Sequence, residues 1–247
     1  MGLVRTISIL LLFNIPIFAK VNLLFYCDIT MVNPMLEIVQ VIEQKHDCKI
    51  TIIQGGSRDL YASLDMAKKG DLFFPGDPLL FKNDTQGYFT YPKRIGYNTL
   101  AIFVQKGNPL HVKNLDDFLR EDLLVAVGHP ETSSIGVVGE DILLQYAGAS
   151  FLKKLQFNLS MYAVDSRDMN CMLKDKMIDI GLNWKATMRS GKIKERVDMI
   201  EIDGQYSSPK ALIMSVLKFS EHSDIARAFV DEVASERGQT IMRKYGF

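Results

Sequence analysis

The chain has 247 residues, with 29 lysines and arginines against 29 aspartates and glutamates, and 47% of its residues are hydrophobic. A disordered chain is poorer in apolar residues and further from neutrality, and a nucleic-acid-binding protein usually carries a basic excess. Three cysteines exclude a disulfide-rich scaffold. The composition therefore indicates a folded protein that binds no nucleic acid, with room for one large domain or two small ones.

The first nineteen residues are typical of an export signal. Arg5 precedes residues 7–18, which are apolar apart from Ser8 and Asn14. This run is too short to span the hydrocarbon core of a bilayer, which takes about 20 residues, but it fits the apolar region of a secretory signal. Ala19 is small enough to precede the cleavage site, and no cysteine follows the run directly. We therefore expect a soluble periplasmic protein without a lipid anchor.

Apolar runs typical of strands then alternate with amphipathic stretches typical of helices. Strands are predicted at 21–26, 49–54, 72–74, 101–105, 123–127, 160–164 and 179–183, and helices at 32–46, 58–69, 115–120, 134–147 and 167–176. Repeated strand-then-helix units predict parallel sheets that are covered on both faces. No linker composition separates two domains, so the chain should cross between them on strands, near 96–103 and 207–216.

The cysteines and histidines predict neither a disulfide nor a metal site. Cys27 should end the first strand and Cys48 should begin the second, which places them at opposite ends of neighbouring parallel strands. Cys171 falls in a predicted helix, and the four histidines are scattered. Because no Cys/His spacing of a zinc site occurs, we expect no metal-ion ligand set and no cofactor.

Four predicted junctions between a strand and a helix are rich in small polar residues. They are Asp28-Ile29-Thr30, Gly55-Gly56-Ser57-Arg58, Thr132-Ser133-Ser134-Ile135-Gly136 and Asp165-Ser166-Arg167. Hydroxyl groups and free backbone N–H groups at the positive end of a helix bind anions. Ordinary helix capping also explains each junction, because Ser, Thr and Asp are preferred caps. Four such junctions, one with tandem glycines, favour a binding site at the carboxyl ends of the strands.

Several further segments stand in a recognisable order and spacing. They are Gly55-Gly56-Ser57, Gly70 to Asp77, Val104 to Pro109, Val125 to Pro130 with Ser134 to Gly136, and Asp179 to Trp184. With these segments the chain resembles the periplasmic substrate-binding proteins of ABC importers, and within them the molybdate- and tungstate-binding branch of the type II fold. The resemblance extends from about Val21 to the C-terminus.

The resemblance implies an α/β protein of two lobes, with two parallel-rich sheets joined by two crossover strands. After a signal at 1–19, one lobe would comprise 20–100 and 208–247, and the other 101–207. Such a protein has no catalytic activity. It would hold a tetrahedral oxyanion, molybdate or tungstate first, between the lobes, and would deliver it as a monomer to a membrane permease that it contacts transiently.

The same resemblance implies which residues bind the anion. The contacts of the family fall on Thr30 and Ser57 in the first lobe, and on Ser134, Ile135 and Ser166 in the second. A ligand-touching tyrosine of the family falls on Trp184, whose indole N–H can donate a hydrogen bond but cannot accept one. Ser133 and Arg58 adjoin these positions and are further candidate contacts.

Three charged residues near the proposed site depart from the family pattern. Asp28 would repel an anion unless it is protonated or paired, and Arg58 and Arg167 could pair with it or reach the ligand directly. A solvated position at a helix start is the simpler interpretation of each arginine. If either arginine lines a roomy cleft, a small organic acid becomes an alternative ligand, and the protein could serve a sensor instead of a permease.

An exported enzyme is the alternative from another class. Ser150 and Lys153 have the spacing of a penicillin-binding enzyme motif, but the partner motifs of that family are absent. The acidic pairs Asp116-Asp117 and Glu121-Asp122 fall in a predicted solvated helix and loop, where neighbours in sequence point in different directions. No motif therefore supports catalysis.

Overall fold

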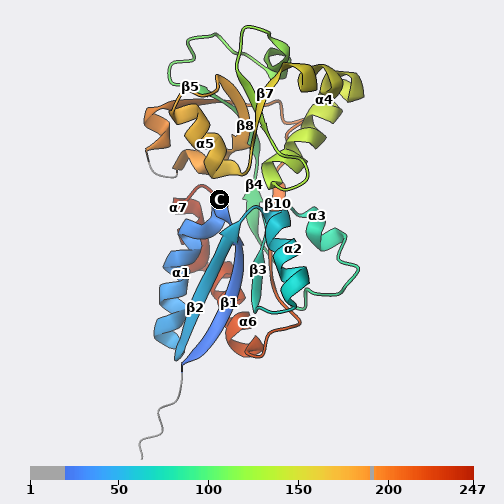
Figure 1. Cartoon of the computed structure of the whole chain (residues 1–247). Helices are drawn as coiled ribbons and strands as arrows, with labels where there is room; N and C mark the ends of the chain where they lie inside the picture. Colours follow the sequence, from blue (N-terminus) through green and yellow to red (C-terminus); the bar gives the residue numbers. More distant parts are fainter. Residues whose placement is uncertain (1–19, 190–191) are drawn as a thin grey trace, which may run out of the picture.

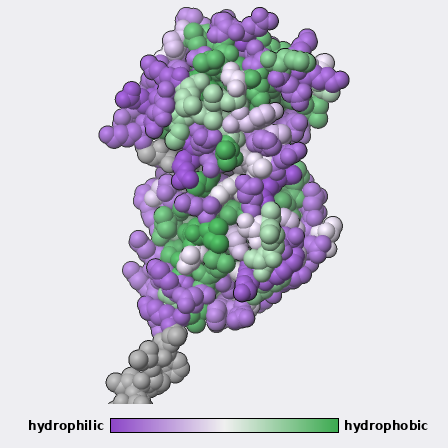
Figure 2. Space-filling view, viewed as in Figure 1, coloured by the Kyte–Doolittle hydropathy of each residue, from purple (hydrophilic) through white to green (hydrophobic). Residues whose placement is uncertain are grey.

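The computed structural model describes residues 20–189 and 192–247, so the predicted export signal at 1–19 lies outside the described residues. The described chain forms two lobes, each built around a five-stranded sheet, and the molecule narrows between them (Figures 1 and 2). The predicted two-lobed α/β fold is therefore confirmed.

The sheet of the first lobe has the strand order β2-β1-β3-β10-β4. Its strands are β1 (Val21–Asp28), β2 (Cys48–Gly55), β3 (Leu72–Phe74), β4 (Lys93–Asn98) and β10 (Lys210–Val216). The helices of this lobe are α1 (Val32–Lys45), α2 (Ser57–Ala67), α3 (Leu79–Lys82), α6 (Ser223–Ala234) and α7 (Glu236–Lys244). β1 runs parallel to β2 and β3, whereas β10 is antiparallel to β3 and β4. The carboxyl ends of β1, β2 and β3 therefore point the same way, toward the other lobe (Figure 1).

The sheet of the second lobe has the order β7-β6-β8-β5-β9. Its strands are β5 (Leu100–Gln105), β6 (Val125–Gly128), β7 (Leu159–Ala163), β8 (Ile180–Trp184) and β9 (Val197–Ile200). Its helices are α4 (Ser134–Asn158) and α5 (Ser166–Lys174), and its 3-10 turns are η2 (Leu115–Leu119), η3 (Lys185–Arg189) and η4 (Ile193–Glu195). The first lobe adds η1 (Ile29–Met31) between β1 and α1. Each sheet has its own apolar core.

The chain passes between the lobes twice. Thr99 alone separates β4 of one sheet from β5 of the other, and the second passage runs from β9 to β10. The sequence analysis predicts passages near 96–103 and 207–216. The C-terminus ends beside the narrow region (Figure 1), where a Cβ atom on Gly246 would lie 3.1 Å from the Cα of Ala186.

Most predicted elements agree with the structure to within a few residues. The helices α3, α6 and α7 were not predicted, however, and two further regions differ. α4 extends to Asn158 instead of ending at 147, with Gly148 in a non-helical conformation at φ 75°. Glycine adopts this conformation without the steric cost of a Cβ atom, so a second helical stretch follows the predicted end. The four-residue strand β9 was not predicted either.

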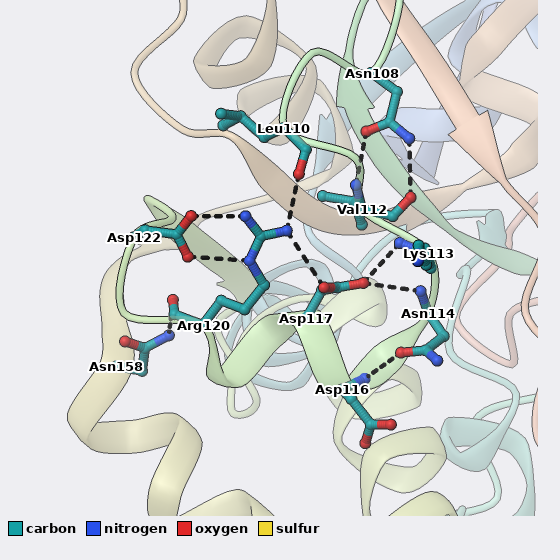
Figure 3. A network of polar contacts seen from close by, with 10 residues as sticks. All are labelled: Asn108, Leu110, Val112, Lys113, Asn114, Asp116, Asp117, Arg120, Asp122 and Asn158. Carbon is teal, nitrogen blue, oxygen red and sulfur yellow. Dashed lines mark hydrogen bonds and ion pairs between the residues drawn. The ribbon is translucent and has the colours of Figure 1, made fainter.

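The acidic residues 116, 117, 121 and 122 lie around η2, as predicted, and two of them hold a loop in place (Figure 3). Arg120 pairs with Asp122 through two hydrogen bonds of 3.0 and 2.6 Å and donates a third, of 2.8 Å, to the carbonyl of Leu110. Asp117 accepts from the backbone N–H of Asn114 at 3.1 Å. These contacts give Asp117 and Asp122 a structural role.

The cysteines lie as the sequence predicts. In the register of β1 and β2, Cys27 lies opposite Gln54 and Cys48 opposite Val21, so the two thiols are at opposite ends of the strand pair, and all three cysteines are free. Within the described part of the chain, the helices are too short or too polar to cross a membrane.

Candidate ligand-binding site

The predicted binding residues meet where the two lobes face each other. In the first lobe, β1 ends at Asp28 and α2 begins at Ser57; in the second, α4 begins at Ser134 and α5 at Ser166. The hydroxyls of Thr30 and Ser166 lie 2.8 Å apart across the two lobes. Four helix-start segments that are distant in sequence therefore share one location.

Asp28 lies at the centre of this cluster and is almost completely buried. Its Oδ2 atom accepts hydrogen bonds from the hydroxyls of Ser57, at 2.5 Å, and Ser134, at 3.3 Å. Its Oδ1 atom accepts from the backbone N–H of Thr30 at 3.0 Å. Three groups that the resemblance assigns to an anionic ligand thus donate to a carboxylate of the protein itself.

Gly76 closes the cluster from the loop after β3. Its backbone N–H donates to the Ser57 hydroxyl at 2.8 Å. A Cβ atom at this position would lie 2.9 Å from the Ser134 hydroxyl and 3.0 Å from the Asp28 carboxylate. Only glycine fits there without displacing both groups. The sequence segment that contains Gly76 supported the resemblance but gave no sign that it belongs to the site.

A second close approach involves the tandem glycines. A Cβ atom on Gly56 would lie 2.9 Å from the backbone carbonyl oxygen of Thr132 in the other lobe. Since backbone atoms cannot rotate away as the end of a side chain can, this glycine allows the two lobes to approach each other.

Two residues of β8 position the hydroxyls of the second lobe. Trp184 is 1% exposed, and its indole N–H donates to the Ser134 hydroxyl at 3.1 Å. Asn183 donates from its side-chain amide to the carbonyl of Ser166 at 2.9 Å. Asn183 was not predicted as a site residue, although it lies directly before Trp184. Ile135 packs into the core of the second lobe.

The capping interpretation applies at three of the four junctions. Asp28 caps η1 by accepting from the N–H of Thr30. Ser133 accepts from the N–H of Gly136 at 3.0 Å and so caps α4. Asp165 caps α5 by accepting from the N–H groups of Arg167 and Asp168. Ser57 is not a cap, because the residue that precedes α2 is Gly56.

Neither arginine pairs with Asp28. Arg58 pairs with the buried Asp77 at 3.3 Å and is 38% exposed. Arg167 is exposed at the start of α5 and lines a pocket of about 130 Å³ between the lobes. The polar residues of this pocket come from both lobes and the C-terminal segment: Thr30, Asn33, Gln54, Ser166, Arg167, Asn170, Thr187 and Tyr245.

Burial dominates the electrostatics of Asp28. Removal from water raises the pKa of its carboxyl above the ordinary value, although hydrogen bonds from Ser57, Thr30 and Gly76 act in the opposite direction. Burial and the neighbouring Asp28 together hold the pKa of the Cys27 thiol well above its usual range. Among residues 20–189 and 192–247, no three His, Cys, Asp or Glu side chains gather as a metal site would require.

Comparison with known proteins places this geometry in a family. Residues 23–247 match the model of the bacterial extracellular solute-binding proteins. The chain is 25% identical to YvgL of Bacillus subtilis (strain 168), which is named as a candidate ABC transporter substrate-binding lipoprotein. The similarity covers 79% of this chain and 69% of YvgL.

Two solved structures share the fold. The periplasmic molybdate-binding protein of Azotobacter vinelandii has a TM-score of 0.76 at 15% identity, covering 91% of this chain and 97% of its own. The periplasmic binding protein AfuA of Actinobacillus pleuropneumoniae, solved with bound fructose-6-phosphate, also has a TM-score of 0.76, at 17% identity, covering 92% and 83%. The fold is that of the type II periplasmic binding proteins, and the chain belongs to the bacterial extracellular solute-binding protein family.

Proposed function

We propose that the protein captures a tetrahedral oxyanion between its two lobes and delivers it to the membrane permease of an ABC importer. Molybdate and tungstate are the first ligands to test. The family membership supports a solute-binding role, and the name of YvgL supports an ABC transporter. Export with cleavage near Ala19, a periplasmic location and a monomeric state belong to the same proposal.

The observation that carries the proposal is the convergence of donors on one buried point. Hydroxyls of Ser57 and Ser134 and the backbone N–H of Thr30 all point at the Asp28 carboxylate. A carboxylate and an oxyanion present the same kind of acceptor, a negatively charged oxygen. A set of donors that surrounds a carboxylate is therefore chemically suited to bind an oxyanion.

Calorimetry on the purified mature protein tests the proposal with molybdate, tungstate, sulfate, phosphate and thiosulfate. We expect at least one of them to release or absorb heat with a stoichiometry of about one, as a single cleft requires. A thermal-shift assay with the same anions is the second readout. Absence of both heat and thermal shift with all five would reject oxyanion binding.

A second candidate ligand is an organic anion, and the pocket beside Thr30 and Ser166 favours it. Arg167 offers a planar cation for a carboxylate or phosphate, and the amides of Asn33, Gln54 and Asn170 offer hydrogen bonds to hydroxyl groups. The anionic group would contact Thr30 and Ser166, and the body of the molecule would lie in the pocket.

Substitution of the arginine separates the two ligand classes. For an organic anion such as fructose-6-phosphate, Arg167→Ala should weaken binding by about 1.5–3 kcal/mol, the range for hydrogen bonds to charged groups. Inorganic anions, held at the hydroxyl cluster, should bind as before and serve as the internal control. If Arg167→Ala weakened the binding of organic and inorganic anions equally, the proposal that they bind at different places, the pocket and the hydroxyl cluster, would be rejected.

A further inference from the structure

The Asp28 carboxylate occupies the point on which the donors of both lobes converge. Ser57 reaches it from α2 at 2.5 Å and Ser134 from α4 at 3.3 Å, and a Cβ atom on Gly76 would lie 2.9 Å from the Ser134 hydroxyl and 3.0 Å from the carboxylate itself. An anion that binds to these donors would therefore bring a second negative charge into hydrogen-bonding range of a buried carboxylate.

No cation neutralises Asp28 in the described part of the chain. Within residues 20–189 and 192–247, its carboxylate forms no ion pair, and its partners are a backbone N–H and neutral hydroxyls. Arg58, the residue directly after Ser57, pairs with Asp77 instead. A buried charge without a counter-ion has a large electrostatic effect on any neighbouring charge, because little water screens it.

Other ionisable groups lie on the elements around Asp28. They are Cys27 on β1, Arg58 and Asp59 on α2, Asp77 after β3, His129 and Glu131 before α4, Asp165 and Arg167 at α5, and Lys185 after β8. Among the described residues, none of these side chains forms a hydrogen bond or ion pair with the Asp28 carboxylate. Asp165 caps α5, and the ring of His129 packs against Tyr162. Asp28 is therefore the ionisable group in direct contact with the proposed anion-binding donors.

Two negative groups at hydrogen-bonding distance cannot both stay fully ionised, and such pairs share a proton. We propose that anion binding in the cleft is coupled to the uptake of one proton, which is held between Asp28 and the ligand. This inference rests on the proposed function. The proton comes from the solvent or enters on the ligand, and it forms a hydrogen bond between a carboxylate oxygen and a ligand oxygen.

The shared proton makes Asp28 a specificity-determining residue. An anion that carries a proton near neutral pH, such as hydrogen phosphate, donates a hydrogen bond to Asp28. A phosphate monoester has a second pKa of about 6 and is mostly a dianion without a proton there. A fully ionised anion such as sulfate has no proton to donate, so Asp28 must take one from solvent first. Site groups that are left unpaired or repelled discriminate strongly between ligands of similar shape.

Calorimetry in two buffers that differ in ionisation enthalpy measures the proton directly. We would titrate molybdate into the wild-type protein at several pH values, because a molybdate ion near neutral pH brings no proton of its own. We expect uptake of about one proton per ligand, and a Kd that rises about tenfold for each pH unit above neutrality. This measurement on the wild type needs no variant to fold.

Asp28→Asn removes the ionisable group and keeps the size of the side chain. In this variant we expect no proton uptake, a Kd that does not change with pH, and a preference for phosphate over sulfate that falls about tenfold or more. Asp165→Asn is the matched control, because Asn also caps helices well; it should keep the proton uptake.

The outcomes separate the two proposals. Anion binding by the wild type without proton uptake would overturn the role of Asp28 and leave oxyanion capture standing. Proton uptake that persists in Asp28→Asn would likewise overturn the role of Asp28 and leave oxyanion capture standing. No anion binding by either protein would overturn both proposals together.

Discussion

The hydroxyls of Thr30 and Ser166 lie 2.8 Å apart, although 136 positions separate the two residues in the sequence. Thr30 follows β1 in the first lobe, and Ser166 begins α5 in the second. A hydrogen bond of this length forms only when the lobes are in contact. The pair therefore marks an arrangement in which the two lobes are in contact. Periplasmic binding proteins close around their ligands by hinge motion, and we expect such a motion here about the two crossover segments.

Ser57→Ala should weaken ligand binding. The serine hydroxyl is completely buried and donates to the central carboxylate, while it accepts from Gly76. Loss of one donor to a charged group should cost about 1.5–3 kcal/mol of binding free energy, measured by calorimetry. Ser63→Ala, at an exposed position of the same helix, is the control and should bind as the wild type does. Unchanged affinity in Ser57→Ala would remove Ser57 from the site.

Gly76→Ala should oppose closure of the lobes. The added methyl group would lie about as close to Ser134 and Asp28 as a hydrogen-bonded atom does, at 2.9 and 3.0 Å. Overpacking of this kind costs about 1–3 kcal/mol, which corresponds to a loss of affinity of about 5- to 150-fold. Small-angle scattering should also give a larger radius of gyration.

Gly204→Ala is the matched control, because nothing lies within 4 Å of a Cβ atom there. If Gly76→Ala matched this control in affinity and in radius of gyration, the close approach at Gly76 would contribute nothing to ligand binding or to closure of the lobes.

Trp184 should report ligand binding by fluorescence. It is the only tryptophan of the chain, and its indole N–H donates to Ser134, one of the hydroxyls at the centre of the cluster. A ligand that takes over the Ser134 hydroxyl changes the surroundings of the indole, so emission should shift on binding. In Ser134→Ala the emission without ligand should already differ. A flat signal with a ligand that calorimetry detects would place that ligand away from the cluster.

The stability of the protein should depend on pH through Asp28. Burial raises the pKa of Asp28 in the folded state, whereas the unfolded value is about 3.9. At pH values between these two pKa values, the native state therefore binds more protons than the unfolded state. Stability should therefore fall as pH rises through this window, and the penalty is fully present above it.

Asp28→Asn removes this penalty. In urea unfolding, the variant should gain free energy of unfolding relative to the wild type as pH rises from about 4 to 8. A difference between the two proteins that does not change with pH would show that burial of this carboxylate costs nothing.

The junctions between strands and helices were predictable because their signals are local. An apolar run ends, and capping residues follow within a few positions, as at Thr30 and Ser166. Because parallel strands direct their carboxyl ends to one side of a sheet, local signals were enough to place each residue at the binding edge of its own lobe.

Contacts between distant segments left no comparable signal. The pairing of Arg58 with Asp77, the close approach of Gly76 and the support of Ser166 by Asn183 each depend on how separate loops and strands pack. The sequence marked Asp28 as an acid near the site, but its central position depends on donors from both lobes. No periodicity or spacing within one segment records such an arrangement.

The central claim is that the cleft between the lobes holds a small anion. Mass spectrometry of the native protein, purified from the cells that produce it, tests this claim most directly. We expect a bound oxyanion or a small phosphorylated or carboxylated molecule at a stoichiometry of about one, released from Ser57→Ala more readily than from Ser63→Ala. A neutral or cationic ligand, bound equally well by both variants, would contradict the claim.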